Sequence, residues 1–323
     1  MRAIRSITFT KDRLCAIGDG DWNDAMNKAG EQGKGSSIWL SMFLYYVLNE
    51  CSFFIEDKDL VGKLLKNLQS AVNKYFNGES FARLVRDNGK ALGYDDGFID
   101  LITQAFAVIS GIADSDRGTK AMQSAKKLVD EKNRIVKLLS PAFDKYTDVG
   151  SIGKYPKGVR ENGGQYTHGA LWYVIALYMM GENNKAYEIL NMILPYSHSV
   201  NGNSFTYKVE PYVVSADIYS YDGAGEGGWS WYTGSASWAY VVIIEYLLGI
   251  KKEVDILTIS PALPDCIKDV KVELNFNNIP ICIEIHNTLG SKWSIYYNGV
   301  NYNTNKIRIC NENKNKKYEL YKI

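Results

Sequence analysis

Hydrophobic and polar positions follow two different periods along the 323-residue chain. Between residue 36 and about residue 250, apolar residues recur at the spacing that is typical of helices. The segment 36–50 is apolar almost all round and predicts a buried helix, whereas the segment 59–76 carries its leucines on one stripe. The same spacing predicts further helices at 95–112, 120–133, 168–181, 183–194 and 233–250.

The period falls to two beyond about residue 252. Apolar and polar positions alternate in segments 270–276 and 279–285. Segments 291–300 and 305–323 continue as short strands with Asn-Gly or Asn-rich turns between them. These patterns predict a small antiparallel β domain that follows the helices.

The chain is therefore expected to be mainly α, with a helical domain at 1–251 and the β domain at 252–323. Long loops rich in Gly, Tyr, Asp and Asn join the predicted helices. Loops of this kind, carried on helical hairpins, favour a toroid with a site at one rim.

Composition narrows the class of partner. Lys and Arg number 37 against 36 Asp and Glu, with no long basic run, so we expect no nucleic-acid partner. The five cysteines are odd in number and form no C-x-x-C pair, which favours buried free thiols in a reducing compartment. The first residues lack an apolar signal segment, and no stretch is long enough to span a membrane. We therefore expect a cytoplasmic protein.

An acidic loop, "GDGDWNDAMNKAG" at 18–30, places three aspartates around Trp22. A calcium loop that started at Asp19 would need Gly at its sixth position and Glu at its twelfth. Those positions hold Asp24 and Gly30, so no metal site is predicted.

Sugar chemistry fits this loop better. Cleavage of a glycosidic bond needs a carboxylic acid beside the leaving oxygen, and a nearby aromatic surface that desolvates the acid and raises its pKa. Asp24 with Trp22 meets both needs, and Asp21 or Asn23 would serve sugar hydroxyls. The alternative is that Asp24 only caps the helix that follows. The residues alone leave both interpretations open.

Two glycine-containing loops precede predicted helices. One, at 157–172, carries Arg160, Glu161 and His168, and the other, at 226–240, carries Thr233 and Gly234. Helix N-termini present unpaired N–H groups to anions, so both loops are candidates for a phosphate site. A structural histidine and a simple Arg160–Glu161 ion pair are the alternatives.

Four segments together resemble the signature blocks of glycoside hydrolase family 94. They are "GDGDWNDAMNKAG", "YPKGVRENGGQYTHGALW", "YKVEPYVVSADIYS" and "GGWSWYTGSASWAY". This family holds inverting phosphorylases such as those of cellobiose, chitobiose and 1,2-β-oligoglucans, and the phosphorylase-like domain of cyclic β-1,2-glucan synthases. The resemblance implies a partial (α/α)6 barrel at 1–251 followed by a β-sandwich. It also implies a glycosyltransferase in which inorganic phosphate attacks a β-linked gluco-oligosaccharide and gives α-glucose 1-phosphate, without another cofactor.

The resemblance also implies a role for individual residues, matched motif by motif. It makes Asp24 the general acid and leaves Asp19 and Asp21 to shape the loop. The matched substrate residues are Trp22, Arg160 and Glu161 at the sugar, Tyr155 on the acceptor side, and His168, Thr233 and Gly234 at phosphate.

The resemblance reaches only the C-terminal part of the family's architecture. The family's N-terminal sandwich and first barrel helices, with further sugar-binding and phosphate-binding residues, have no counterpart in this sequence. We therefore expect a second chain or a homo-oligomer to complete the site, and apolar faces near 38–48 and 235–249 in the isolated chain. The alternatives are a carbohydrate-binding remnant or subunit of a split cyclic β-1,2-glucan synthase-like protein, and an inverting hydrolase. A hydrolase is disfavoured because the sequence offers no obvious second carboxylate.

Overall fold

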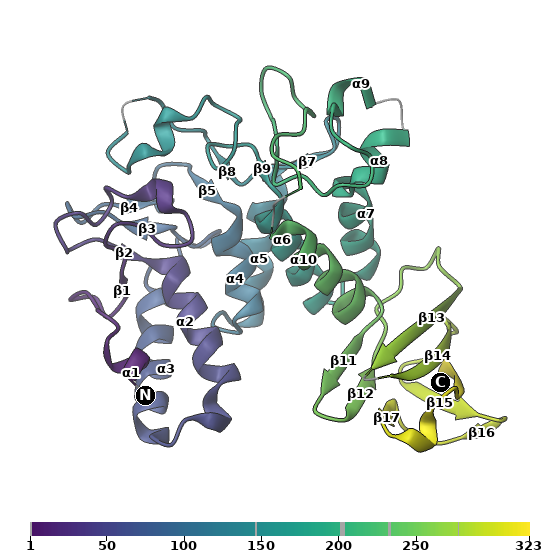
Figure 1. Cartoon of the computed structure of the whole chain (residues 1–323). Coiled ribbons are helices and arrows are strands. Elements are labelled where there is room, and N and C mark those ends of the chain that lie inside the picture. The colour runs from purple at the N-terminus through teal and green to yellow at the C-terminus, as the bar shows by residue number, and fades with distance from the viewer. Residues whose placement is uncertain (1, 146, 201–203, 232–233, 277) are drawn as a thin grey trace. The chain divides into compact units, whose positions relative to one another are not determined.

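The computed structural model describes residues 2–145, 147–200, 204–231, 234–276 and 278–323. The chain divides into two compact units, which are described one at a time (Figure 1). The first consists of Met1–Met180 and Leu190–Ala236, and the second of Gly181–Ile189 and Ser237–Ile323.

Helices of the first unit start directly after two-residue strands. They are α2 (Ile38–Glu50) after β2 (Ser36–Ser37), α4 (Leu101–Ile109) after β5 (Ile99–Asp100), and α6 (Thr167–Met179) after β9 (Gln165–Tyr166). Helix α4 packs against both α2 and α6, and Figure 1 shows the three entering strands at the same end of these helices. The loops that carry the predicted site residues therefore meet along one edge.

Two outer helices each pack against one of the helices that follow the short strands. Helix α3 (Lys58–Asn73) packs on α2, and α5 (Ser115–Ala125) packs on α4. Nearly every residue of α6 is buried, whereas α3 buries one stripe, which is the expected difference between a central and a peripheral helix. Helical hairpins are thus the repeating unit, as the sequence predicted.

Capping residues set several helix boundaries that periodicity missed. The predicted helix 95–112 begins only at Leu101, because the Asp100 side chain accepts the Thr103 N–H and caps α4. The predicted helix 120–133 is wrong at both ends, since Asp114 caps α5 and the chain enters strand β6 at Val129. The predicted helix 233–250 is α10 (Ser235–Val241) followed by a π-helix at Val242–Leu247.

Short elements complete the first unit. One sheet has four strands in the order β1 (Cys15–Ala16), β2, β3 (Leu84–Val85), β4 (Ala91–Leu92). Three further sheets have two strands each: β5 with β8 (Leu139–Ser140), β6 (Val129–Asp130) with β7 (Ile135–Val136), and β9 with β10 (Asp217–Ile218). The remaining helices are α1 (Arg2–Arg5), α8 (Pro195–Val200), α9 (Ser204–Tyr207) and the 3₁₀ turns Asp24–Met26, Ser52–Phe54, Lys126–Leu128 and Ser151–Lys154. Helix α7 (Asn183–Ile193) contributes to both units.

The second unit contains two sheets. One has the order β11 (Ile250–Glu253), β12 (Ile256–Ile259), β17 (Lys306–Arg308), and the other β13 (Asp269–Phe276), β14 (Ile279–His286), β18 (Lys317–Lys322), β15 (Trp293–Tyr297), β16 (Val300–Asn301). A 3₁₀ turn, Asn311–Asn313, precedes β18. The expectation of a wholly antiparallel domain is wrong at one ladder, because the last strand enters between β14 and β15 and runs parallel to β14.

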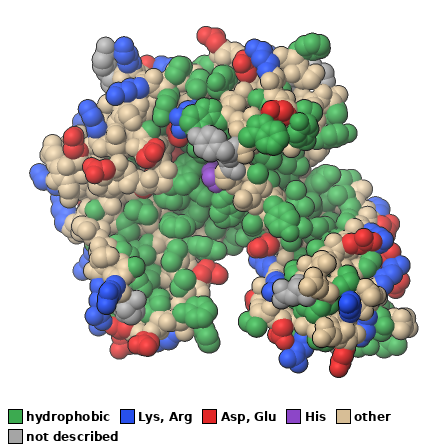
Figure 2. Space-filling view, in the orientation of Figure 1, with side chains coloured by type: hydrophobic (Ala, Val, Ile, Leu, Met, Phe, Trp, Pro, Cys, Tyr) green, Lys and Arg blue, Asp and Glu red, His purple; other side chains and the backbone are tan. Residues whose placement is uncertain are grey.

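Apolar side chains remain on the surface of the first unit. Figure 2 shows hydrophobic side chains gathered over helices α2 to α5, and Phe43 of α2 is 38% exposed. Among the described residues, no helix is long and apolar enough to cross a membrane. In the same part of the chain, no group of three or more His, Cys, Asp or Glu side chains is arranged to hold a metal ion. All five cysteines are free thiols, although Cys51 and Cys266 are exposed and not buried as expected.

Candidate active site

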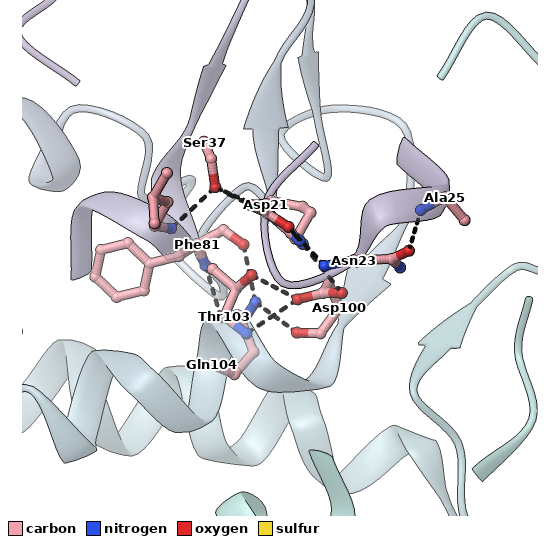
Figure 3. A network of polar contacts seen from close by, with 10 residues as sticks. Asp21, Asn23, Ala25, Ser37, Phe81, Asp100, Thr103 and Gln104 are labelled. Atoms are coloured by element: carbon pink, nitrogen blue, oxygen red, sulfur yellow. Dashed lines mark hydrogen bonds and ion pairs between the residues drawn. The ribbon is translucent and has the colours of Figure 1, made fainter. Parts of the chain in front are cut away.

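A buried ion pair anchors the acidic loop (Figure 3). The two terminal nitrogens of Arg83 each donate to one oxygen of Asp21 at 2.7 Å, and both side chains are 0% exposed. The Ser37 hydroxyl and the Asn23 N–H also donate to Asp21, at 2.6 and 2.9 Å. Burial opposes ionisation of Asp21, but Arg83 and these donors hold the pKa of this carboxyl below its ordinary value.

Arg83 links this loop to the start of α4. Its Nε lies 3.5 Å from Oδ2 of Asp100, whose other oxygen accepts from the backbone and hydroxyl of Thr103. Burial outweighs Arg83 here and raises the pKa of Asp100. Asp21 therefore shapes the loop, as predicted. The idea that Asp21 or Asn23 binds sugar hydroxyls is wrong, because both side chains are buried and used inside the network.

Asp24 has a different environment from Asp21. It is exposed and begins the 3₁₀ turn Asp24–Met26, which Asn23 caps by accepting the Ala25 N–H at 3.2 Å. Asp24 is therefore not the capping residue. Its side chain is exposed and not enclosed by the Trp22 ring as we expected. Its charge still reaches the site, because burial raises the pKa of Glu161 and the charge of Asp24 adds to this effect.

Aromatic rings form a wall beside Asp24. The Trp22 ring centroid lies 5.1 Å from that of Tyr166 and 5.3 Å from that of Trp172. Trp39 and Phe106 extend the cluster, with centroids 6.1 and 5.1 Å from that of Trp172. Trp172, Trp39 and Phe106 are buried and support Trp22 and Tyr166, which are partly exposed. Trp22 and Tyr166 are therefore the rings of this cluster that suit the apolar face of a pyranose.

His168 and Gly234 lie together, as the phosphate-site prediction requires. His168 is the second residue of α6, and its ring stacks on Tyr166 with centroids 6.2 Å apart. A Cβ placed on Gly234 would lie 2.9 Å from both Cε1 and Nε2 of His168, so any other residue there would displace the imidazole. Burial lowers the pKa of His168, which keeps the imidazole neutral near pH 7. Thr233 lies outside the described residues.

Arg160 occupies the centre of a second polar cluster. Its guanidinium lies over the rings of Trp229 and Tyr155, 4.4 and 4.8 Å from their centroids. Its Nε is 3.3 Å from Oε2 of Glu161, although this oxygen has no partner with hydrogen-bond geometry. A simple Arg160–Glu161 ion pair therefore does not describe this cluster fully, because the guanidinium also makes cation–π contacts with two aromatic rings.

A comparison with models of protein families identifies the family to which the chain belongs. Residues 2–249 match the model described as glycosyl hydrolase 94 superfamily, catalytic domain. The chain belongs to this superfamily. The resemblance of the four signature segments is thereby confirmed.

Individual relatives in the superfamily are longer than this chain. The cyclic β-(1,2)-glucan synthase NdvB of Rhizobium meliloti (strain 1021) is 41% identical over 259 residues, which are 76% of this chain and 9% of that protein. Solabiose phosphorylase of Paenibacillus borealis is 31% identical over 260 residues, which are 76% of this chain and 34% of that protein. The chain thus spans about a third or less of the length of these relatives.

A solved structure described as a sialidase gives a TM-score of 0.56 at 13% identity, over 84% of this chain and 25% of that one. At this identity the likeness concerns the fold alone.

Three residues to which the sequence analysis assigned no role lie in these clusters. Asp217 and Trp229 lie beside Arg160, and both belong to segments quoted for the resemblance, so a signal existed but named no role. Arg83 stands in the apolar run 81–85, where a lone cation is an anomaly that predicts a buried partner. Glu161 and Asp217 are both buried near Arg160, so the structure places two carboxylates in the second cluster that the sequence-based argument against a hydrolase did not consider.

Proposed function

We propose that this chain is the C-terminal catalytic portion of an inverting glycoside phosphorylase. The observation that carries the proposal is one assembly on the first unit, in which exposed Asp24, the aromatic wall around Trp22 and the His168–Gly234 pair belong to one set of loops. The Trp22 and His168 centroids are 6.0 Å apart, so a sugar on one group and an anion on the other would be in contact.

The reaction follows from these roles. A phosphate oxygen attacks the anomeric carbon of a β-glucoside while the bond to the leaving oxygen breaks. Asp24 gives its proton to that oxygen, and the product is α-glucose 1-phosphate. No second carboxylate is needed to activate the nucleophile, because phosphate is already an anion. Arg160, Glu161 and Tyr155 would contact the sugars, and Thr233 would join His168 and Gly234 at phosphate.

The architecture belongs to the same proposal. We infer that residues 1–251 are part of an (α/α)6 barrel, since α2, α4 and α6 each lead from the rim and α3 and α5 pair with them. Residues 252–323 would be a C-terminal β domain of a cytoplasmic protein. A second chain or a second copy would cover apolar side chains such as Phe43 and complete the site.

The second candidate is a carbohydrate-binding subunit without turnover. The 41% identity to NdvB favours it as the alternative, because this chain matches only 9% of that protein. The two candidates differ in one observable, since only the first predicts that glucose 1-phosphate appears.

The deciding experiment measures release of glucose 1-phosphate from a panel of β-glucobioses, with and without inorganic phosphate. In whichever assembled form is active, Asp24→Asn should lower the rate by about 10²–10⁴-fold, because the amide has no acidic proton to give. Binding of the disaccharide should survive, since the side chain keeps its size.

Glu31→Gln is the matched control, because it changes an exposed carboxylate directly after the same loop without touching the assigned acid, and it should keep near wild-type turnover. An Asp24→Asn variant with more than a tenth of the wild-type rate would exclude Asp24 as the acid. Turnover without phosphate would identify a hydrolase. A monomer that is active by itself would exclude the need for a second chain.

A further inference from the structure

Asp217 is a buried carboxylate with two backbone partners. It lies in β10, is 2% exposed, and accepts the Trp229 N–H on Oδ1 at 3.1 Å and the Arg160 N–H on Oδ2 at 3.2 Å. One carboxylate thus joins two segments that are far apart in the sequence. Each of the two N–H groups belongs to a residue whose side chain enters the Arg160 cluster.

The backbone around Asp217 is shaped for this contact. A Cβ on Gly228 would lie 2.2 Å from Oδ1 of Asp217, so any other residue there would displace the carboxylate. Arg160 has a φ of 50°, a left-handed conformation that a non-glycine residue adopts only when its surroundings hold it. The Asp217 contact supplies one such restraint directly at the strained residue.

Arg160 and Trp229, whose N–H groups both donate to Asp217, also contact each other through their side chains. The Arg160 guanidinium lies 4.4 Å from the Trp229 ring centroid, while Trp229 remains 50% exposed. An exposed indole that is held in place by a cation offers a flat surface for the apolar face of a pyranose ring. The guanidinium and Glu161 beside it offer partners for the hydroxyls of the same sugar.

We infer that Asp217 is a positioning residue that sets the Arg160–Trp229 pair, and that Trp229 is a sugar-stacking residue of the site. This inference rests on the proposed function and extends it to residues to which no role has been assigned. It places the pair on the sugar side, so phosphate binding at His168 and Gly234 should not depend on Asp217.

The test is a double-variant cycle read out by calorimetry on the full chain, with β-1,2-glucobiose and inorganic phosphate as separate titrants. Asp217→Ala and Gly228→Ala should each weaken disaccharide binding by about 10–100-fold and change phosphate binding by less than about twofold. Because Gly228→Ala acts by displacing Asp217, the double variant should bind the disaccharide no more weakly than either single variant. Trp229→Ala should weaken disaccharide binding without affecting phosphate.

Asp96→Ala is the matched control. Asp96 also accepts two backbone N–H groups, from Gly93 and Phe98 at 3.0 and 3.1 Å, but its loop carries none of the assigned residues. Its disaccharide affinity should equal that of the wild type. Equal losses for both titrants in Asp217→Ala, or additive losses in the double variant, would overturn the inference and leave the proposed function intact. These titrations use whichever assembled form is active. An assembled wild-type protein that binds phosphate but no disaccharide would contradict this inference, and one that binds neither would contradict the proposed function as well.

Discussion

Two arginines in the first unit each lie near two carboxylates, yet their environments differ. Arg83 is 0% exposed and donates twice to Asp21 at 2.7 Å. The Arg160 side chain is 26% exposed, is 3.3 Å from Glu161, and shares its charge with aromatic rings. The first arrangement satisfies its charges internally, whereas the second keeps hydrogen-bonding capacity for something outside the chain.

The pKa directions follow this difference only in part, because burial also raises the pKa of Asp100 beside Arg83. Arg83 and its hydrogen-bond network hold the pKa of Asp21 below its ordinary value in spite of burial. Burial raises the pKa of Glu161 and of Asp217, and Arg160 does not compensate for it. Perturbed carboxylates with incomplete partners are typical of ligand sites, and fully paired ones of structural centres. The comparison thus distinguishes the ion pair that anchors the acidic loop from the cluster that we propose as the sugar site.

The largest effect is expected from removal of the structural cation. Arg83→Met would leave Asp21 and Asp100 buried without their counter-ion, which costs about 3–5 kcal/mol of the free energy of unfolding. Urea unfolding followed by circular dichroism measures it. Arg117→Met is the control, because Arg117 pairs with Asp114 on the surface, where such a pair contributes about 0–1 kcal/mol. Equal losses in the two variants would remove the distinction between the arginines.

An intermediate effect is expected at Arg160, and in binding more than in stability. Arg160→Met keeps much of the side-chain volume but removes the donors, so the affinity for β-1,2-glucobiose should fall about 10–100-fold. Lys157→Met, at an exposed cation of the same loop that pairs with Asp144, should leave this affinity unchanged. If Arg160→Met lost as much stability as Arg83→Met and no affinity, Arg160 would be a structural residue.

The smallest effect concerns pH. A raised folded-state pKa gives Glu161 a contribution to stability that is present below pH 4.5 and is lost as pH rises through the folded value. The stability of the wild type relative to Glu161→Gln should therefore decrease as pH rises from 4.5 towards 7. Asp21 has the opposite sign, since its lowered pKa gives a contribution that is present above pH 3.8 and is lost as pH falls below it.

The wild type relative to Asp21→Asn should accordingly show a nearly constant advantage between pH 4.5 and 7. Urea unfolding at several pH values measures both differences. Parallel pH profiles for the two pairs would contradict the assignment of opposite environments.

The sequence predicted the helical hairpins and the later strands because periodicity reports which face of an element is buried. It also selected Asp24 over Asp21 through the signature segment, and the burial of Asp21 agrees with that choice. It missed Arg83 and Asp217, since their partners are far away in the chain and pairing at a distance leaves no local pattern. The parallel ladder of β18 was missed for the same reason, because alternation predicts a strand but not its neighbour.

The Arg83 network also has a consequence for the order in which parts of the chain fold. The acidic loop precedes its anchor Arg83 and the second carboxylate, Asp100, by about 60 and 80 residues, so it is synthesised before both. Contacts between distant segments form after local ones, because closing the intervening chain costs entropy. The acidic loop can therefore reach its final conformation only once α2 and α4 have packed together, so a chain that has been synthesised only as far as α2 carries this loop without the contacts that shape it.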